Sequence, residues 1–93
     1  MLVIVETFYA GNEKSGSPIR VRPLAGQGFS TEMRVECSKA MRTAYPIGQK
    51  FSLHARVTSR LDGPDFLYSS YRDEWSPVTD EKAKKFIKEI FIK

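Results

Sequence analysis

Basic side chains alternate with apolar ones in several short stretches of this chain. That spacing is typical of β-strands with one buried and one solvated face, so we expect the basic residues on the outward face of a sheet. They are Arg20, Arg22, Arg34, Lys50, Arg56 and Arg60. Aromatic residues stand near the expected strand ends and turns, and the candidates for exposed rings are Tyr68, Tyr71 and Trp75. Sequence-tolerant proteins bind single-stranded nucleic acid by placing cations on phosphates and rings on bases. A small binding module for single-stranded nucleic acid is therefore our first hypothesis.

Charge is also segregated along the 93 residues. Residues 14–60 carry nine basic and two acidic side chains, whereas residues 61–81 carry six acidic and one basic. The net charge of +4 hides this separation. Opposite patches can join two copies or dock another protein. The alternative hypothesis is therefore a protein–protein interaction module, acting as a homodimer, an inhibitor or an adaptor.

Catalysis is not expected, because no nucleophile, base and orienting group can be assembled from this sequence. His54 is the only histidine and is predicted to be a polar residue on the outward face of a strand. Cys37 is the only cysteine and is predicted to be a small buried hydrophobe. The remaining enzyme hypothesis is a small-ligand site in a barrel mouth, with His54 and the acidic turn as its candidates.

The acidic residues have a plain structural interpretation. Asp62 and Asp65 flank Gly63-Pro64 and are expected to satisfy the backbone of a turn. Together with Asp73 and Glu74 they match no calcium loop, and no Cys/His cluster suits zinc. No metal site and no cofactor are expected.

A single domain spanning residues 1–93 is predicted, with a strand-rich body over 1–75 and a helix over about 80–92. A lone cysteine cannot form an internal disulfide. The apolar start Met1–Val5 ends at Glu6, before a signal-peptide core could form. No apolar run approaches the roughly 18 residues of a membrane span. We expect a cytoplasmic protein without membrane contact.

Five strands are needed to position the basic residues. The predicted ranges are Leu2–Tyr9, Ile19–Pro23, Thr31–Ser38, Gln49–Arg60 and Phe66–Tyr71. Pro23 should stop the second strand or place it at an edge. In Gln49–Arg60 the alternation points Phe51, Leu53, Ala55 and Val57 inward. The turn signal Asp62-Gly63-Pro64-Asp65 predicts that the last two strands form a hairpin.

The C-terminal segment changes to helical spacing. Thr79 is a suitable N-cap, and an apolar stripe follows at Ala83, Phe86, Ile87, Ile90 and Phe91. The lysines of this helix are predicted to form a solvated face. The expected fold class is α+β, with about five mostly antiparallel strands in a strongly twisted sheet or small barrel and one amphipathic helix packed on it.

Overall fold

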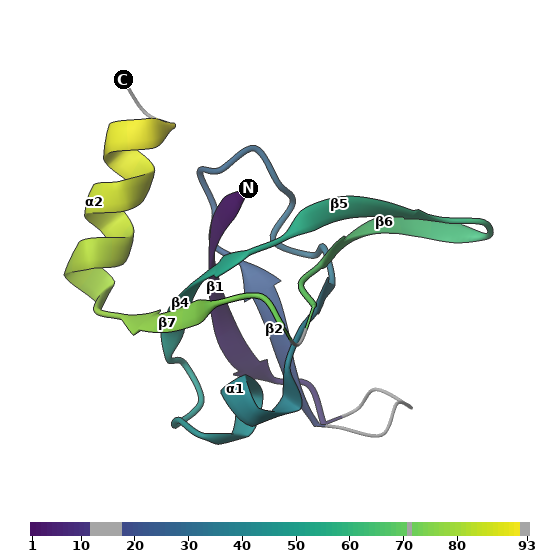
Figure 1. Cartoon of the computed structure of the whole chain (residues 1–93), viewed down its shortest axis with the longest axis horizontal. Helices are drawn as coiled ribbons and strands as arrows, with labels where there is room; N and C mark the ends of the chain where they lie inside the picture. Colours follow the sequence, from purple (N-terminus) through teal and green to yellow (C-terminus); the bar gives the residue numbers. More distant parts are fainter. Residues whose placement is uncertain (12–17, 71, 92–93) are drawn as a thin grey trace.

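The computed structural model describes residues 1–11, 18–70 and 72–91 (Figure 1). Over these residues the chain forms two sheets and two helices. In chain order the elements are β1 (Leu2–Tyr9), β2 (Ile19–Pro23), β3 (Val35–Glu36), α1 (Lys39–Thr43), β4 (Lys50–His54), β5 (Arg56–Arg60), β6 (Gly63–Tyr68), β7 (Trp75–Val78) and α2 (Asp80–Ile90). The predicted α+β class, the mostly antiparallel pairing and the C-terminal helix are confirmed. The described residues contain seven strands, more than the five predicted.

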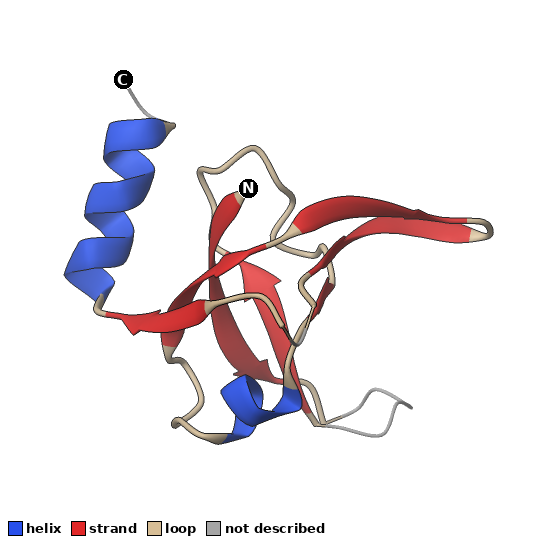
Figure 2. Ribbon diagram, viewed as in Figure 1, coloured by secondary structure: helices blue, strands red, loops and turns tan. Residues whose placement is uncertain are grey.

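The strands lie in a four-stranded sheet, ordered β2-β1-β4-β7, and a three-stranded sheet, ordered β3-β6-β5. All pairs are antiparallel except β3 with β6. Only Ala55 separates β4 from β5, so one continuous stretch of chain contributes a strand to each sheet (Figure 2). No ladder joins β2 to β3, although both are edge strands. The small barrel considered from the sequence is therefore wrong, because the sheets stay open at this seam.

β1 is buried on both faces, which explains its nearly unbroken apolar sequence. Val3 and Val5 point into the main core between the two sheets, where they meet Phe51 and Leu53 of β4. Ile4 points the other way and packs under α2. β1 and β2 have the predicted bounds, and β2 is an edge strand as Pro23 indicated.

The segment Gln49–Arg60 is not the single strand that its alternation predicted. Regular pairing stops at Ala55, and beyond it β5 leaves the body as one half of a projecting hairpin (Figure 1). Val57, predicted to point inward, is 46% exposed. An irregularity in the β5–β6 register between Thr58 and Arg60 further bends this arm.

The predicted strand Thr31–Ser38 is reduced to the two residues of β3. A local turn delays its start, because the Ser30 hydroxyl accepts a hydrogen bond from the Glu32 N–H and the Ser30 carbonyl accepts one from the Met33 N–H. Side chains that compete in this way for nearby backbone groups favour turns over strands. The short β3 leaves the seam beside β2 open.

The predicted hairpin is confirmed as β5 and β6, with a shorter connection than expected. Arg60 pairs with Gly63, so the turn residues are Leu61 and Asp62. The strand β7 was not predicted. It pairs with β4 at the opposite edge of the four-stranded sheet, and Pro77 suits an edge position.

α2 begins as predicted at Thr79, whose hydroxyl accepts a 3.1 Å hydrogen bond from the Lys82 N–H. Its buried residues Ala83 and Ile87 pack with Ile4 on the outer face of the four-stranded sheet. No helix within residues 1–11, 18–70 or 72–91 is long and apolar enough to cross a membrane.

Candidate functional site

A row of charged residues crosses the outer face of the four-stranded sheet. Glu6 of β1 lies opposite Arg22 of β2 on one side and opposite Lys50 of β4 on the other. Arg22 Nε lies 3.4 Å from Glu6 Oε1. Lys50 Nζ lies 2.9 Å from Oδ1 of Asp80 at the start of α2. Strand register thus places two cations around one carboxylate, beside the helix.

A groove of about 780 Å³ lies between this row and α2, and we call it the basic groove. It is lined by Glu6, Arg22, Pro23, Leu24, Ala25, Thr31, Lys50, Lys84, Ile87 and Lys88. Leu24 and Ala25 supply apolar surface, and Lys84 and Lys88 add two cations from α2. Neither of these lysines forms an ion pair with another residue of the described ranges. The groove combines apolar surface with four basic side chains and one carboxylate.

A second hollow continues from the basic groove along the seam between β2 and β3. This seam pocket has a volume of about 350 Å³ and is lined by Phe8, Arg20, Val21, Arg22 and residues 31–36. It shares Arg22 and Thr31 with the basic groove. Arg20 and Arg34 add two cations, while Glu32 and Glu36 offset part of this charge. The two hollows thus adjoin at two residues, and we call them together the depression. Six basic side chains line it, drawn from β2, β4, α2 and the loop before β3.

Two neighbouring side chains, Phe8 and Glu6, hold the Arg22 guanidinium in place. Its guanidinium carbon lies 4.6 Å from the centre of the Phe8 ring, and Glu6 pairs with its Nε. A cation held over a ring in this way has fewer rotamers to lose when it binds a ligand. Arg22 is therefore held by two contacts at the junction of the two hollows.

Arg60 lies farther along, beside a third hollow of about 430 Å³ that also includes Arg34. Arg60 Nη2 lies 2.7 Å from Glu36 Oε1, and its guanidinium carbon lies 4.3 Å from the centre of the Phe66 ring. Arg56 lies elsewhere on β5, over the Tyr68 ring at 5.5 Å. Four of the predicted cations therefore line the depression: Arg20, Arg22, Arg34 and Lys50. Arg60 lies next to the depression, and Arg56 lies away from it.

The aromatic candidates are not beside the cations of the depression. The Trp75 ring meets the rings of Phe51 and Tyr45 edge to face, with centroids 5.7 and 6.2 Å away, and packs against the main core. Tyr68 is half-buried under Arg56. Tyr71 lies outside the described residues. Apolar contact in the depression is offered instead by Phe8, Leu24 and Ala25.

Lys84 and Lys88 were missed from the sequence because all lysines of α2 were assigned to one solvated face. A finer signal was present. Lys84 and Lys88 directly follow the buried residues Ala83 and Ile87, so they border the apolar stripe and stay close to whatever it packs on. Lys85 lies on the opposite side of the helix.

The other groups that could do chemistry are dispersed. His54 is exposed at the end of β4 and lines a separate pocket of about 300 Å³ with Tyr68 and Asp73. Burial raises the pKa of the Cys37 thiol to about 11, against the opposing effect of Arg42, so the thiol stays protonated at neutral pH. Among the residues that the structure describes, no three His, Cys, Asp or Glu side chains gather closely enough to hold a metal ion.

Comparison with protein-family models, with curated proteins and with solved structures finds no match to this chain.

Proposed function

We propose that this protein is a non-enzymatic binding module that holds single-stranded nucleic acid in the basic groove and the seam pocket. The observation that carries the proposal is the convergence of six basic side chains on two hollows that meet at Arg22 and Thr31. These side chains come from chain segments far apart in the sequence. Cations arranged along one depression suit a ligand with evenly spaced negative charges.

The apolar surface of the depression favours a single strand over a duplex. Leu24, Ala25 and Phe8 can contact a base only when its face is accessible, and duplex bases present mainly their edges. Arg22, half-exposed over Phe8, can also stack on a base through its guanidinium plane. The projecting hairpin does not suit a duplex groove, because Asp62 at its tip would meet the phosphates.

The test is fluorescence anisotropy of nanomolar labelled single-stranded DNA, single-stranded RNA or duplex DNA, titrated with protein up to about 10 μM at increasing salt. We expect micromolar or tighter binding to single strands at physiological salt, and weaker binding to duplex. Replacing Lys84 and Lys88 by Gln should weaken single-strand binding about tenfold and reduce the log–log salt slope by about 1.4.

The matched control carries the same substitution at Lys82 and Lys85, which lie on α2 outside the basic groove. It has the same net charge as the groove variant and should bind nearly as the parent does. Absence of binding at physiological salt, or equal weakening in the two variants, would contradict the proposal. Equal weakening would indicate general attraction to a basic protein.

A further inference from the structure

The β5–β6 hairpin projects from the body as an arm with an unusual end. Its turn residue Leu61 is 99% exposed, the largest exposure among the large hydrophobic residues of the described ranges. Asp62 lies beside it in the turn, and Asp65 follows on β6. We call Leu61, Asp62 and Asp65 the acidic tip.

Neither carboxylate of the acidic tip forms an ion pair with a residue that the structure describes. The prediction that they satisfy the turn backbone is wrong, since neither accepts a hydrogen bond from a described residue. The nearest cation along the chain, Arg60, is already engaged by Glu36 and the Phe66 ring. The tip thus presents an exposed leucine next to two uncompensated negative charges.

The basic groove has the complementary chemistry. Leu24 and Ala25 offer apolar surface for a leucine side chain, while Lys84 and Lys88 offer cations that have no ion-pair partner among the described residues. An apolar anchor flanked by carboxylates would therefore fit an apolar surface bordered by lysines. Such charge pairing selects the partner and its orientation.

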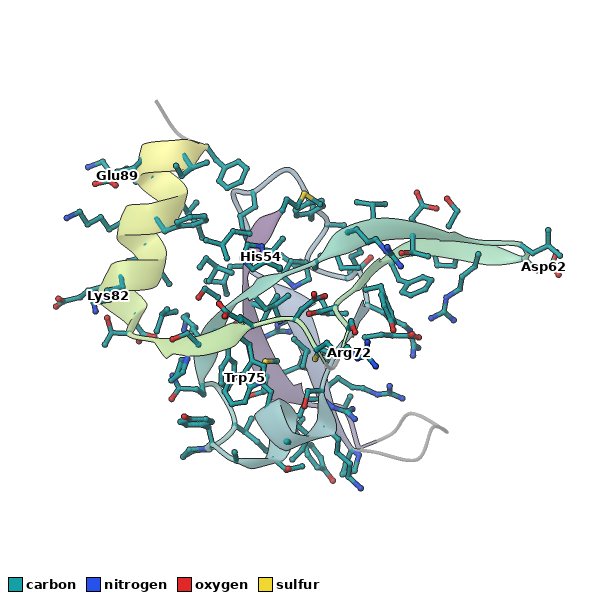
Figure 3. All side chains as sticks on the ribbon, viewed as in Figure 1. His54, Asp62, Arg72, Trp75, Lys82 and Glu89 are labelled. Carbon is teal, nitrogen blue, oxygen red and sulfur yellow. The ribbon has the colours of Figure 1, made fainter. Side chains whose placement is uncertain are left out.

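The acidic tip cannot reach the groove of its own molecule. Figure 3 shows Asp62 at one end of the longest axis and Lys82 and Glu89 of α2 at the other. The molecule extends 38 Å along this axis, and the rest of the body lies between. Contact between the two surfaces therefore requires a second copy.

We infer that the acidic tip of one copy docks into the basic groove of a second copy. The contact joins two different surfaces, so each bound copy still offers one free tip or one free groove. Contacts of this head-to-tail type produce rings when the rotation closes and open chains when it does not. A three-residue tip buries less than the roughly 1,200 Å² of a standard interface, so the association is weak and depends on concentration. The inference does not depend on nucleic-acid binding.

The experiment is sedimentation equilibrium of the full chain, free of nucleic acid, from about 10 μM to about 1 mM at low salt. We expect the average mass to rise with concentration and to fall when salt is added, because the contact is partly electrostatic. A monomeric mass throughout this range would overturn the inference.

Two variants identify the surfaces involved. The tip variant carries Leu61→Ser and Asp62→Asn, and the groove variant carries Lys84→Glu and Lys88→Glu. All four positions are exposed, so both proteins should keep the circular dichroism spectrum and the Trp75 emission of the parent. Each alone should associate at least tenfold more weakly than the parent, whereas Lys82→Glu with Lys85→Glu, which matches the groove variant in charge, should associate as the parent does.

Mixing the two variants provides the decisive measurement. The groove variant retains an intact tip, and the tip variant retains an intact groove, so one productive contact can form. An equimolar mixture should therefore give a 1:1 dimer and nothing larger. A mixture that remains monomeric, or variants that each associate like the parent, would overturn the head-to-tail arrangement. The result is independent of the anisotropy assay, because the mass measurements contain no nucleic acid.

Discussion

Beyond the end of β2, the side chain of Gln27 forms hydrogen bonds to the β1 backbone that a neighbouring strand would otherwise form. Its Oε1 accepts a 2.8 Å hydrogen bond from the Ile4 N–H, and its Nε2 donates to the carbonyl oxygens of Ile4 and Leu24 at 2.8 and 3.0 Å. Gln27 is 3% exposed. Nothing in the local sequence signals this role, because a glutamine between Gly26 and Gly28 has only the composition of a loop.

Replacing Gln27 by Leu should destabilise the fold by about 1–3 kcal/mol, because the substitution leaves the buried Ile4 N–H without a partner. Urea unfolding followed by Trp75 emission measures this loss. As a control, Gln49→Leu should cost less, because the Gln49 amide binds the Val78 carbonyl in a part-buried position that water can reach. Equal losses would mean that the Gln27 hydrogen bonds contribute little.

Cys37 makes stability depend on alkaline pH. Its pKa rises from the ordinary 9.0 to about 11 on folding, because burial disfavours the thiolate. Between pH 9 and 11 the unfolded chain therefore binds fewer protons at this residue than the native chain, and stability falls as pH rises. The free energy of unfolding of the parent should fall more steeply over this window than that of Cys37→Ala. Parallel pH profiles would contradict the assigned burial effect.

Whether an aromatic side chain is exposed cannot be predicted from its position in the sequence alone. Trp75 and Tyr68 stand near the ends of strands, where exposure was expected. Whether such a ring is buried depends on strand pairing, and β4 pairs with β7 in a register that brings Trp75 beside Leu53 and onto the core. No local pattern records that pairing.

The helices differ in how their first turns are held. Thr79 accepts a side-chain hydrogen bond from Lys82 N–H, and Asp80 and Glu81 complement the dipole of α2. Ser38 precedes α1 but makes no side-chain cap hydrogen bond. Thr79 therefore caps α2 with its side chain, whereas Ser38 does not cap α1. The sequence alone could not show this difference.

Thr79→Ala should destabilise the protein by about 1 kcal/mol, because it removes a formed N-cap. Ser38→Ala is the matched control and should change the free energy of unfolding by less than about 0.5 kcal/mol. Chemical unfolding of both variants checks the difference. A larger loss from Ser38→Ala than from Thr79→Ala would be inconsistent with these caps.

The division of Gln49–Arg60 into β4 and β5 has consequences for both proposals. Lys50 lies on β4 and lines the basic groove, whereas Arg60 lies on β5, which is one strand of the projecting arm. Alternation of apolar and polar residues continues through Ala55, so the pattern predicted one strand. The strand is interrupted at Ala55 because the chain passes there from the four-stranded sheet to the three-stranded sheet, and the two sheets run in different directions (Figure 2).

The segregation of charge along the chain is only partly kept in space, because Asp80 of the acidic segment pairs with Lys50 beside the basic groove. The acidic tip and α2 stand at opposite ends of the longest axis, and the basic groove lies beside α2 (Figure 3). Under the two proposals, nucleic acid and the acidic tip of another copy use the same groove. The binding of one therefore excludes the other.

A short single-stranded oligonucleotide should thus lower the average mass of the concentrated protein, because it displaces the acidic tip from the groove. Sedimentation velocity of labelled oligonucleotide with the parent and with the tip variant measures the competition. The tip variant should bind the oligonucleotide equally well at low and high protein concentration. Oligonucleotide bound to the parent without loss of mass would show that the two ligands do not share a site.

Strand alternation, Pro23, the hairpin turn and the Thr79 cap were enough to predict β1, β2, the β5–β6 hairpin, α2 and the α+β class, because each depends on interactions within a few residues. The separation of basic and acidic segments was likewise readable from the chain. The open seam, the break at Ala55 and the strand β7 were not, since they depend on pairing between distant segments. The same long-range pairing brings Lys84 and Lys88 beside Arg22 and Lys50, so only the folded molecule places these cations around one groove.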